Sequence, residues 1–195
     1  MKRVGVLAVQ GGFAAHLRAL VDVGCEAVSV RRPVDLEGLD GLILPGGEST
    51  THLQLIERFG LQPGLDAFAA SGRPMLVTCA GLILAAARVT DPAQPSFGWL
   101  DVDVARNAWG RQVHSFQAVA DDSDLPLLFI RAPRITRIGE GVEVTARFKG
   151  EPVMVRRGRL VGAAFHPELT HDRRVHRALF GGGQGWLLRP PTLNS

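Results

Sequence analysis

Three side chains in this sequence are of the types that together perform nucleophilic acyl transfer: a cysteine, a histidine and a glutamate. Cys79 ends one apolar run, and a second apolar run begins two residues later, which is typical of a strand, a sharp turn and a helix. His166 and Glu168 lie far downstream, separated only by Pro167. A histidine can accept the thiol proton and later give it to a leaving amine, and a carboxylate can orient the imidazole. These residues predict an acyl-transfer enzyme with a Cys79–His166–Glu168 site.

The corner that we predict at Cys79 would favour a reactive thiol. The start of a helix stabilises a thiolate, and the backbone N–H of Ala80 would point at an oxyanion that forms on an attacked carbonyl. Gly81 would let the helix start approach its surroundings closely. The alternative is a small buried cysteine inside an ordinary strand–helix unit, and this segment alone does not decide between the two. The downstream histidine and glutamate favour the catalytic interpretation.

A second strand end carries the turn Pro45-Gly46-Gly47, which precedes Glu48 and Ser49. Two glycines allow a backbone to present N–H groups to a ligand. The alternative is a tight turn followed by a helix cap. A phosphate cradle fits less well, because no Gly-Lys-Ser/Thr ending is present. We expect Gly47 to supply a second oxyanion donor, opposite Ala80.

The composition restricts the class of protein. The chain has 195 residues, of which 46% are hydrophobic and 21% charged, and its formal net charge is +3. This charge is too small to argue for a nucleic-acid partner. No apolar run is long enough to cross a bilayer and no signal peptide is evident, so we expect a cytoplasmic protein without membrane contact.

The remaining cysteine and histidines provide little evidence for a disulfide or a metal site. Cys25 and Cys79 are the two cysteines, which argues against a disulfide framework. His171 and His176 with Asp172 do not form a convincing metal-binding set, and we interpret the two histidines as helix-surface residues. We expect neither a metal nor a cofactor.

The first half of the chain alternates between short apolar runs and amphipathic segments, whereas the part after residue 100 is rich in short strands. The predicted strands are 4–9, 27–30, 41–44, 75–78, 102–104, 115–119, 127–130, 142–148, 153–155 and 160–164. The predicted helices begin near 13, 49, 65, 80 and 173 and end near 23, 59, 71, 87 and 179.

Alternation of strands and helices predicts an α/β fold with crossover connections. We expect one domain over 1–195, a three-layer sandwich around a mixed, mostly parallel, flavodoxin-like sheet, with a flexible tail over 181–195. The later strands would add antiparallel pieces to the same sheet or its edge. The basic residues of 156–159 would form a hairpin tip, and an anionic partner surface is the alternative.

In this order, the motifs Pro45-Gly46-Gly47, Thr78-Cys79-Ala80-Gly81 and His166-Pro167-Glu168 resemble class I (triad) glutamine amidotransferases. Residues 4–180 look like the glutaminase subunits of pyridoxal 5′-phosphate synthases. The more specific segments of this resemblance are Gly46-Gly47-Glu48-Ser49-Thr50 and Arg106-Asn107-Ala108-Trp109-Gly110-Arg111-Gln112.

The resemblance implies a role for each matching residue. Cys79 would attack the side-chain amide of L-glutamine to give a glutamyl thioester and ammonia. His166 would shuttle the proton, Glu168 would orient His166, and Gly47 and Ala80 would form the oxyanion hole. The residues that would contact glutamine are Gly47, Glu48, Ser49, Arg106, Ile130 and Arg131. Gln10 would lie near the site and the partner interface.

The resemblance also implies a partner. Ammonia would pass to a separate synthase subunit with a (β/α)₈ barrel, which condenses it with ribose 5-phosphate and glyceraldehyde 3-phosphate. The glutaminase would be nearly silent without that subunit.

The chain departs from the family pattern at three positions: Val77 replaces a glycine at the entry to the elbow, and His114 and Gln117 replace an aspartate and a glutamate.

Three other functions stay open: a glutaminase of another system such as imidazole glycerol phosphate synthase, an idle regulatory or scaffold homologue, and a cysteine peptidase or related hydrolase. The Glu48 and Arg106 segments disfavour the first, and the complete Cys79–His166–Glu168 set disfavours the second. The third would need neither Arg106 nor the spacing of His166-Pro167-Glu168.

Overall fold

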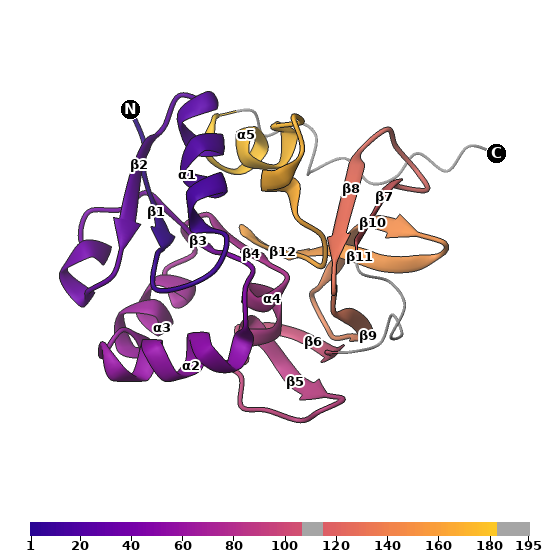
Figure 1. The fold of residues 1–195 in the computed structure, drawn as a ribbon, viewed down its shortest axis with the longest axis horizontal. Coiled ribbons are helices and arrows are strands. Elements are labelled where there is room, and N and C mark those ends of the chain that lie inside the picture. Colours follow the sequence, from indigo (N-terminus) through magenta and orange to yellow (C-terminus); the bar gives the residue numbers. More distant parts are fainter. Residues whose placement is uncertain (107–114, 183–195) are drawn as a thin grey trace.

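A computed structural model describes residues 1–106 and 115–182 of the chain. Helices cover both faces of a central sheet, with α1 and α5 on one side and α2 and α3 on the other (Figure 1). The helices are α1 (Phe13–Asp22), α2 (Ser49–Arg58), α3 (Gln62–Ala70), α4 (Ala80–Ala85) and α5 (Arg174–Phe180), with short 3₁₀ turns η1 (Pro33–Leu36) and η2 (Pro167–Leu169). This is the three-layer α/β sandwich that the sequence predicts.

The central sheet has seven strands in the order β10-β11-β12-β4-β3-β1-β2. Its strands are β1 (Arg3–Leu7), β2 (Glu26–Val30), β3 (Gly41–Leu44), β4 (Met75–Thr78), β10 (Glu143–Phe148), β11 (Glu151–Arg157) and β12 (Leu160–Ala163). The five strands β2, β1, β3, β4 and β12 are parallel, and β11 and β10 extend the sheet antiparallel. This is the flavodoxin-like order, in which ligands bind beyond the carboxyl ends of the strands.

Burial explains why the middle strands read as continuous apolar runs. Every residue of β3, β4 and β12 is buried, as expected for parallel strands that helices cover on both faces. Gly41 makes room for α5, since a Cβ there would lie 2.7 Å from the Phe180 ring.

The later strands only partly follow the prediction. We expected them in the same sheet or at its edge, which is correct for β10, β11 and β12. It is wrong for the others, which form a three-stranded sheet and a hairpin of their own. The separate strands are β5 (Ala86–Thr90), β6 (Leu100–Ala105) and β9 (Arg134–Ile138) in one sheet, and β7 (Ser115–Val119) and β8 (Pro126–Ile130) in the other.

Two of these strands, β5 and β9, were not predicted, and the helix expected to reach residue 87 ends at Ala85. No glycine or proline separates α4 from β5, and alanines at the junction suit a helix as well as a strand. Parallel pairing with β6 decides the outcome, because it satisfies the backbone of β5. The 156–159 segment forms the expected hairpin between β11 and β12.

Aromatic packing holds the β7–β8 hairpin against the central sheet. The rings of Phe116 and Phe129 stack at 4.8 Å between centroids, and Phe129 also meets Phe148 at 5.6 Å and Phe165 at 6.2 Å. This cluster brings the end of β8 to the carboxyl ends of β4 and β12.

Within the described residues, no helix is both long and apolar enough to cross a membrane.

Candidate active site

Cys79 occupies the corner between β4 and α4 in a conformation that non-glycine residues rarely adopt. Its φ is 49° and its ψ is −104°. Such strain persists only where the surroundings impose it, and it is common at functional sites. Gly81 permits the corner, because a Cβ there would lie 2.2 Å from the carbonyl oxygen of Leu44. The sequence-based prediction of a sharp elbow is therefore confirmed.

Val77 does not disturb this elbow. It is fully buried and keeps its register between Leu44 of β3 and Gly162 of β12. The side chain thus fills core space at the end of β4, and the turn at Cys79 forms beside it.

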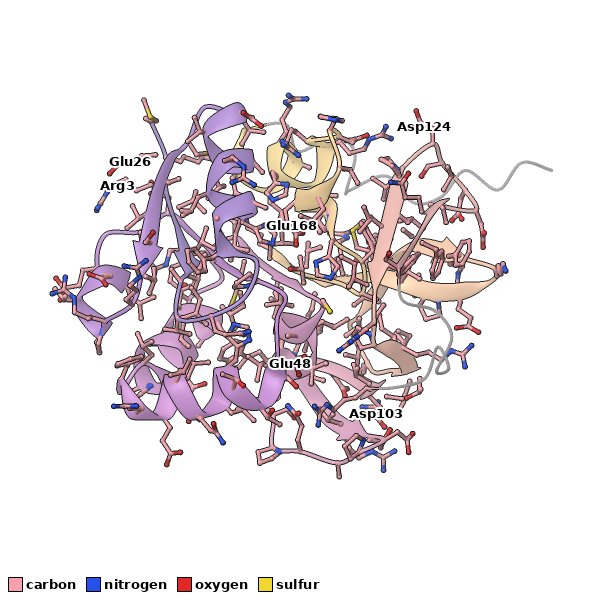
Figure 2. All side chains as sticks on the ribbon, viewed as in Figure 1. Arg3, Glu26, Glu48, Asp103, Asp124 and Glu168 are labelled. Carbon is pink, nitrogen blue, oxygen red and sulfur yellow. The ribbon has the colours of Figure 1, made fainter. Side chains whose placement is uncertain are left out.

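His166 and Glu168 follow β12 and form a buried pair. His166 Nδ1 lies 2.7 Å from Glu168 Oε1, and the backbone N–H of His166 donates to the carbonyl of Leu128 in β8. Glu168 is only 4% exposed, and it lies in the interior of the molecule, unlike Arg3, Glu26 and Asp124 at the periphery (Figure 2). Proline between the two residues fixes the path of the backbone.

The two groups shift each other's proton affinity. Burial disfavours charge on His166, but the neighbouring Cys79 and Glu168 outweigh it and raise the pKa of His166 to about 10. Burial likewise favours the neutral form of Glu168, yet the electrostatic interaction with the neighbouring His16 and the hydrogen bond with His166 lower the pKa of Glu168 below its usual value. An imidazolium–carboxylate pair results at neutral pH.

Cys79 and His166 face each other across Gly46. A Cβ on Gly46 would lie 2.5 Å from His166 Cε1 and 3.3 Å from Cys79 Cβ, so only glycine fits between them. The Cys79 sulfur lies 3.9 Å from the carbonyl oxygen of Ile130, and His166 Nε2 makes no aligned hydrogen bond within the described residues. Because the sulfur is not aligned on this nitrogen, the contact with Glu168 is the firmer cause of the raised His166 pKa.

The turn after β1 holds the turn after β3. The Gly12 N–H donates to the Gly46 carbonyl at 3.0 Å, and Gln10 Oε1 accepts the Glu48 N–H at 3.2 Å. His52 of α2 lies behind them, with its Nε2 3.1 Å from the Gln10 carbonyl. Gln10 was expected near the site and the partner interface. Its side chain fixes the segment that contains Gly47, and its place at a partner interface stays a prediction.

These residues surround one cavity of about 670 Å³. It is lined by Gln10, Gly12, Gly46, Gly47, Glu48, Ser49, Cys79, Ile83, Arg106, Ile130, Arg131, His166, Glu168 and Leu169. Every candidate site residue except Ala80 is in this lining, and Ala80 directly follows Cys79. A hollow of equal volume beside Trp99 contains neither cysteine nor histidine.

Three further observations concern the expected site. The Ser49 hydroxyl donates to Gln94 Oε1 at 2.8 Å, so it is turned to a protein partner. The 107–112 part of the Arg106 segment and position 114 lie outside the described residues. No cluster of three potential metal ligands occurs in the described part of the chain.

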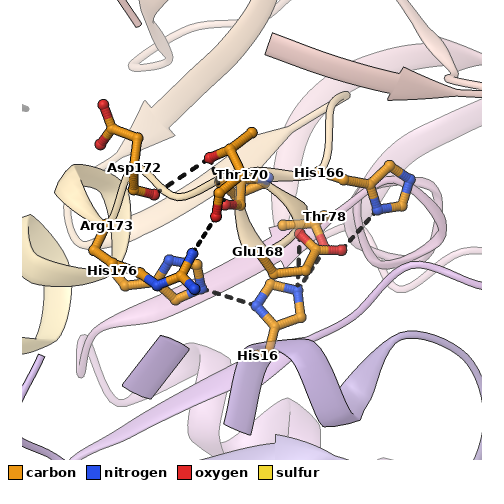
Figure 3. A network of polar contacts seen from close by, with 9 residues as sticks. His16, Thr78, His166, Glu168, Thr170, Asp172, Arg173 and His176 are labelled. Carbon is orange, nitrogen blue, oxygen red and sulfur yellow. Dashed lines mark hydrogen bonds and ion pairs between the residues drawn. The ribbon is translucent and has the colours of Figure 1, made fainter. Parts of the chain in front are cut away.

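His176 corrects the sequence-based interpretation. It was expected on a helix surface, but it is completely buried, with its Nε2 3.0 Å from His16 Nδ1 (Figure 3). The reason is that α5 packs on α1, which turns this face of α5 inward. His171 is exposed, as expected, but it precedes α5 and does not lie on a helix.

Sequence reasoning missed His16, although a signal was present. His16 lies on the apolar face of α1, between Phe13 and Leu20 at helical spacing. A polar residue at such a position requires a buried partner. His16 Nε2 lies 3.2 Å from Thr78 Oγ1 and 3.3 Å from Glu168 Oε2.

A cysteine at a strand–helix elbow, beside a buried histidine–glutamate pair at the carboxyl edge of a flavodoxin-like sheet, defines the class of triad amidotransferases. Comparison with known proteins is more specific. Residues 6–181 match the SNO glutamine amidotransferase family. The chain belongs to this family.

Individual relatives agree with this assignment. The chain is 48% identical to the pyridoxal 5′-phosphate synthase subunit PdxT of Geobacillus kaustophilus over 89% of this chain and 90% of the relative. It is 52% identical to the protein of the same name from Parafrankia sp., over 90% of each chain. A solved structure described as a glutamine amidotransferase superposes with a TM-score of 0.84 at 46% identity, and covers 90% of this chain and 96% of the other.

Proposed function

We propose that this chain is the glutaminase subunit of a pyridoxal 5′-phosphate synthase. It would hydrolyse L-glutamine to L-glutamate and pass the ammonia to a separate synthase subunit. The observation that carries the proposal is the meeting of Cys79, His166 and Glu168 in one cavity. The proposal is supported by relatives that are 48% and 52% identical to this chain over most of its length and are named as subunits of this synthase.

The chemistry follows from the proton affinities. The raised pKa of His166 favours an imidazolium beside the sulfur of Cys79, the proposed nucleophile. Rotation of the Cys79 side chain would bring its sulfur to the glutamine amide carbon, and the carbonyl oxygen would become an oxyanion. The backbone N–H groups of Gly47 and Ala80 are the proposed donors to it. His166 would give its proton to the amide nitrogen as the carbon–nitrogen bond breaks, so that ammonia leaves and the glutamyl group stays on Cys79 as a thioester.

The second half-reaction returns the site to its start. Neutral His166 would take a proton from water, and the hydroxide would attack the thioester carbon. Collapse of this intermediate would release glutamate and the thiolate, with His166 protonated again. Glu168 would keep the imidazole oriented in both steps.

The open part of the cavity suits the backbone groups of glutamine. Arg106 and Arg131 line it, and either guanidinium can pair with the α-carboxylate. Glu48 in the same lining can pair with the α-ammonium group. Ser49 would have to exchange its hydrogen bond with Gln94 before contacting the substrate.

The partner is proposed from the resemblance and from the word subunit in the names of the relatives. We expect a (β/α)₈-barrel synthase that uses ribose 5-phosphate and glyceraldehyde 3-phosphate, and a cytoplasmic complex. Glutamine hydrolysis should be slow for the isolated chain and fast in the mixture.

Glutamate release in the presence and absence of the barrel subunit tests the proposal. The Cys79→Ala variant should lose hydrolysis and retain partner binding. Cys25→Ala is the matched control, because Cys25 is also a buried free thiol but lies against the Phe180 carbonyl, outside the cavity. A folded wild-type chain that is inactive in the mixture would contradict the proposal, as would turnover by Cys79→Ala.

A further inference from the structure

Beyond the proposed triad, the chain buries a pair of histidines that contact each other. His16 of α1 and His176 of α5 are both fully buried, with their rings 5.2 Å apart between centroids. Neither lines the cavity, so neither can contact glutamine. Nothing in the proposed chemistry uses them.

The contacts of His16 lead directly to the triad. Its Nε2 lies between two oxygens, Thr78 Oγ1 at 3.2 Å and Glu168 Oε2 at 3.3 Å (Figure 3). The approach to the carboxylate is a close electrostatic contact rather than an aligned hydrogen bond, since Glu168 Oε2 has no aligned donor within the described residues. The other carboxylate oxygen, Oε1, is the one that holds His166.

The arrangement favours one tautomer of His16. A ring with its proton on Nδ1 would direct the Nε2 lone pair at a buried carboxylate oxygen. A proton on Nε2 instead serves Thr78 and Glu168, and leaves Nδ1 to accept from His176 Nε2 at 3.0 Å. His176 Nδ1, which has no partner within the described residues, then needs no proton.

The charges around His16 agree with a neutral ring. His16 faces Glu168 and His166 from the segment after β12, His176 from α5, and Arg173 from the residue before α5. Burial is the largest influence and lowers the pKa of His16, while Glu168 opposes it. Burial also lowers the pKa of His176, to about 3.

We propose that His16 is a positioning residue, which fixes the ionised Glu168 carboxylate so that its other oxygen orients His166, and that His176 in turn fixes the tautomer of His16. The inference rests on the proposed function, because Cys79 and His166 are taken to do the chemistry. It extends the triad inward, from the cavity through η2 to helices α1 and α5. It also links Glu168 to Thr78, the residue before the nucleophile.

The test compares His16→Leu, which removes the donor, with His16→Gln, whose amide can place an N–H near the former Nε2. In the complex, His16→Leu should lower kcat for glutamine about 10- to 100-fold. This is the range found in metalloenzymes when a residue that orients a functional side chain is removed. KM should stay within about twofold, because His16 does not line the cavity. His16→Gln should recover a substantial part of the loss.

A second readout does not depend on glutamine. In a Cys25→Ala background, the rate of Cys79 alkylation by iodoacetamide reports the thiolate. Without His16 the carboxylate is less well held, the imidazolium is less stabilised, and the pH of half-maximal alkylation should rise. If wild type fails to hydrolyse glutamine but this shift appears, the proposed function falls and the positioning role stands.

Leu20→Ala controls for stability, since Leu20 is buried in α1 one turn from His16. It should lower the melting temperature without moving the alkylation profile. A folded His16→Leu variant with wild-type kcat and alkylation profile would overturn the proposal. A Leu20→Ala variant with the same profile shift as His16→Leu would also overturn it.

Discussion

At the scale of single residues, the site depends on backbone positions where few side chains fit. Cys79 has a positive φ, and Gly46 and Gly81 leave no space for a Cβ. Val77 differs from these positions, because the structure accommodates a bulky residue where the family pattern described in the sequence analysis has a glycine. It is fully buried and does not line the cavity, which indicates that it contributes to stability and not to the chemistry.

Val77→Gly should therefore destabilise the chain without loss of activity. Removal of a fully buried valine side chain, together with the added freedom of glycine, should cost about 2–4 kcal/mol. Urea unfolding measures the free energy, and glutamine hydrolysis in the complex measures activity at a temperature where the variant is folded. A clear fall in kcat with unchanged stability would contradict this interpretation.

Glu168 should make stability depend on acid pH. Its pKa is lower in the folded chain than the ordinary value of 4.5, so its contribution is complete above about 4.5 and is lost as the pH falls through the folded value. Urea midpoints between pH 3 and 7 should fall more steeply for wild type than for Glu168→Gln. Equal slopes in the two proteins would exclude Glu168 as the source.

At the scale of elements, three turns meet at the carboxyl edge of the sheet. The turn after β1 supports the turn after β3, and both lie beside the β4–α4 elbow. The turn after β1 approaches the turn after β3 most closely at Gly11, where a Cβ would lie 2.0 Å from the Gly46 carbonyl oxygen. The position of the proposed oxyanion segment thus depends on a residue outside it.

Gly11→Ala should displace the 46–48 segment and reduce kcat by an order of magnitude or more. Gly24→Ala is a matched control, since φ is +83° at Gly11 and +79° at Gly24, but a Cβ at Gly24 meets nothing within 4 Å. The control should lose about 1 kcal/mol from backbone strain and keep its activity. Equal kcat for the two variants would refute the role of the close contact.

At the scale of the whole molecule, the site joins segments from both ends of the chain. Residues near position 10 and near position 166 line the same cavity, and β4 and β12 between the layers are buried throughout. The carboxyl edge of these central strands is therefore the most rigid place that the fold offers to a strained nucleophile.

Hydrogen exchange should reflect this arrangement. Amides of β3, β4 and β12 should exchange at the rate of global unfolding, whereas those of the edge strands β2 and β10 should exchange faster through local opening. Mass spectrometry of peptides from the native protein measures both groups. Exchange in β4 as fast as in β10 would contradict the expectation.

The sequence by itself determined the local features of this protein. Apolar runs located β1, β3, β4 and β12, and the residues that follow them identified Cys79, the turn at Gly46 and the His166–Glu168 pair. These features are readable because burial imposes a periodic pattern on each element, and because turns and nucleophiles require particular residue types.

Only the tertiary structure decided the long-range pairings. Strands β5 and β9 exist because β6 satisfies their backbones, and the small sheets separate from the central one. His16, Glu168 and His176 meet only because α1, η2 and α5 pack together. The two histidines are 160 positions apart in the sequence. A polar residue on an apolar helix face shows in the sequence that a partner is needed, but the partner's identity is a property of packing.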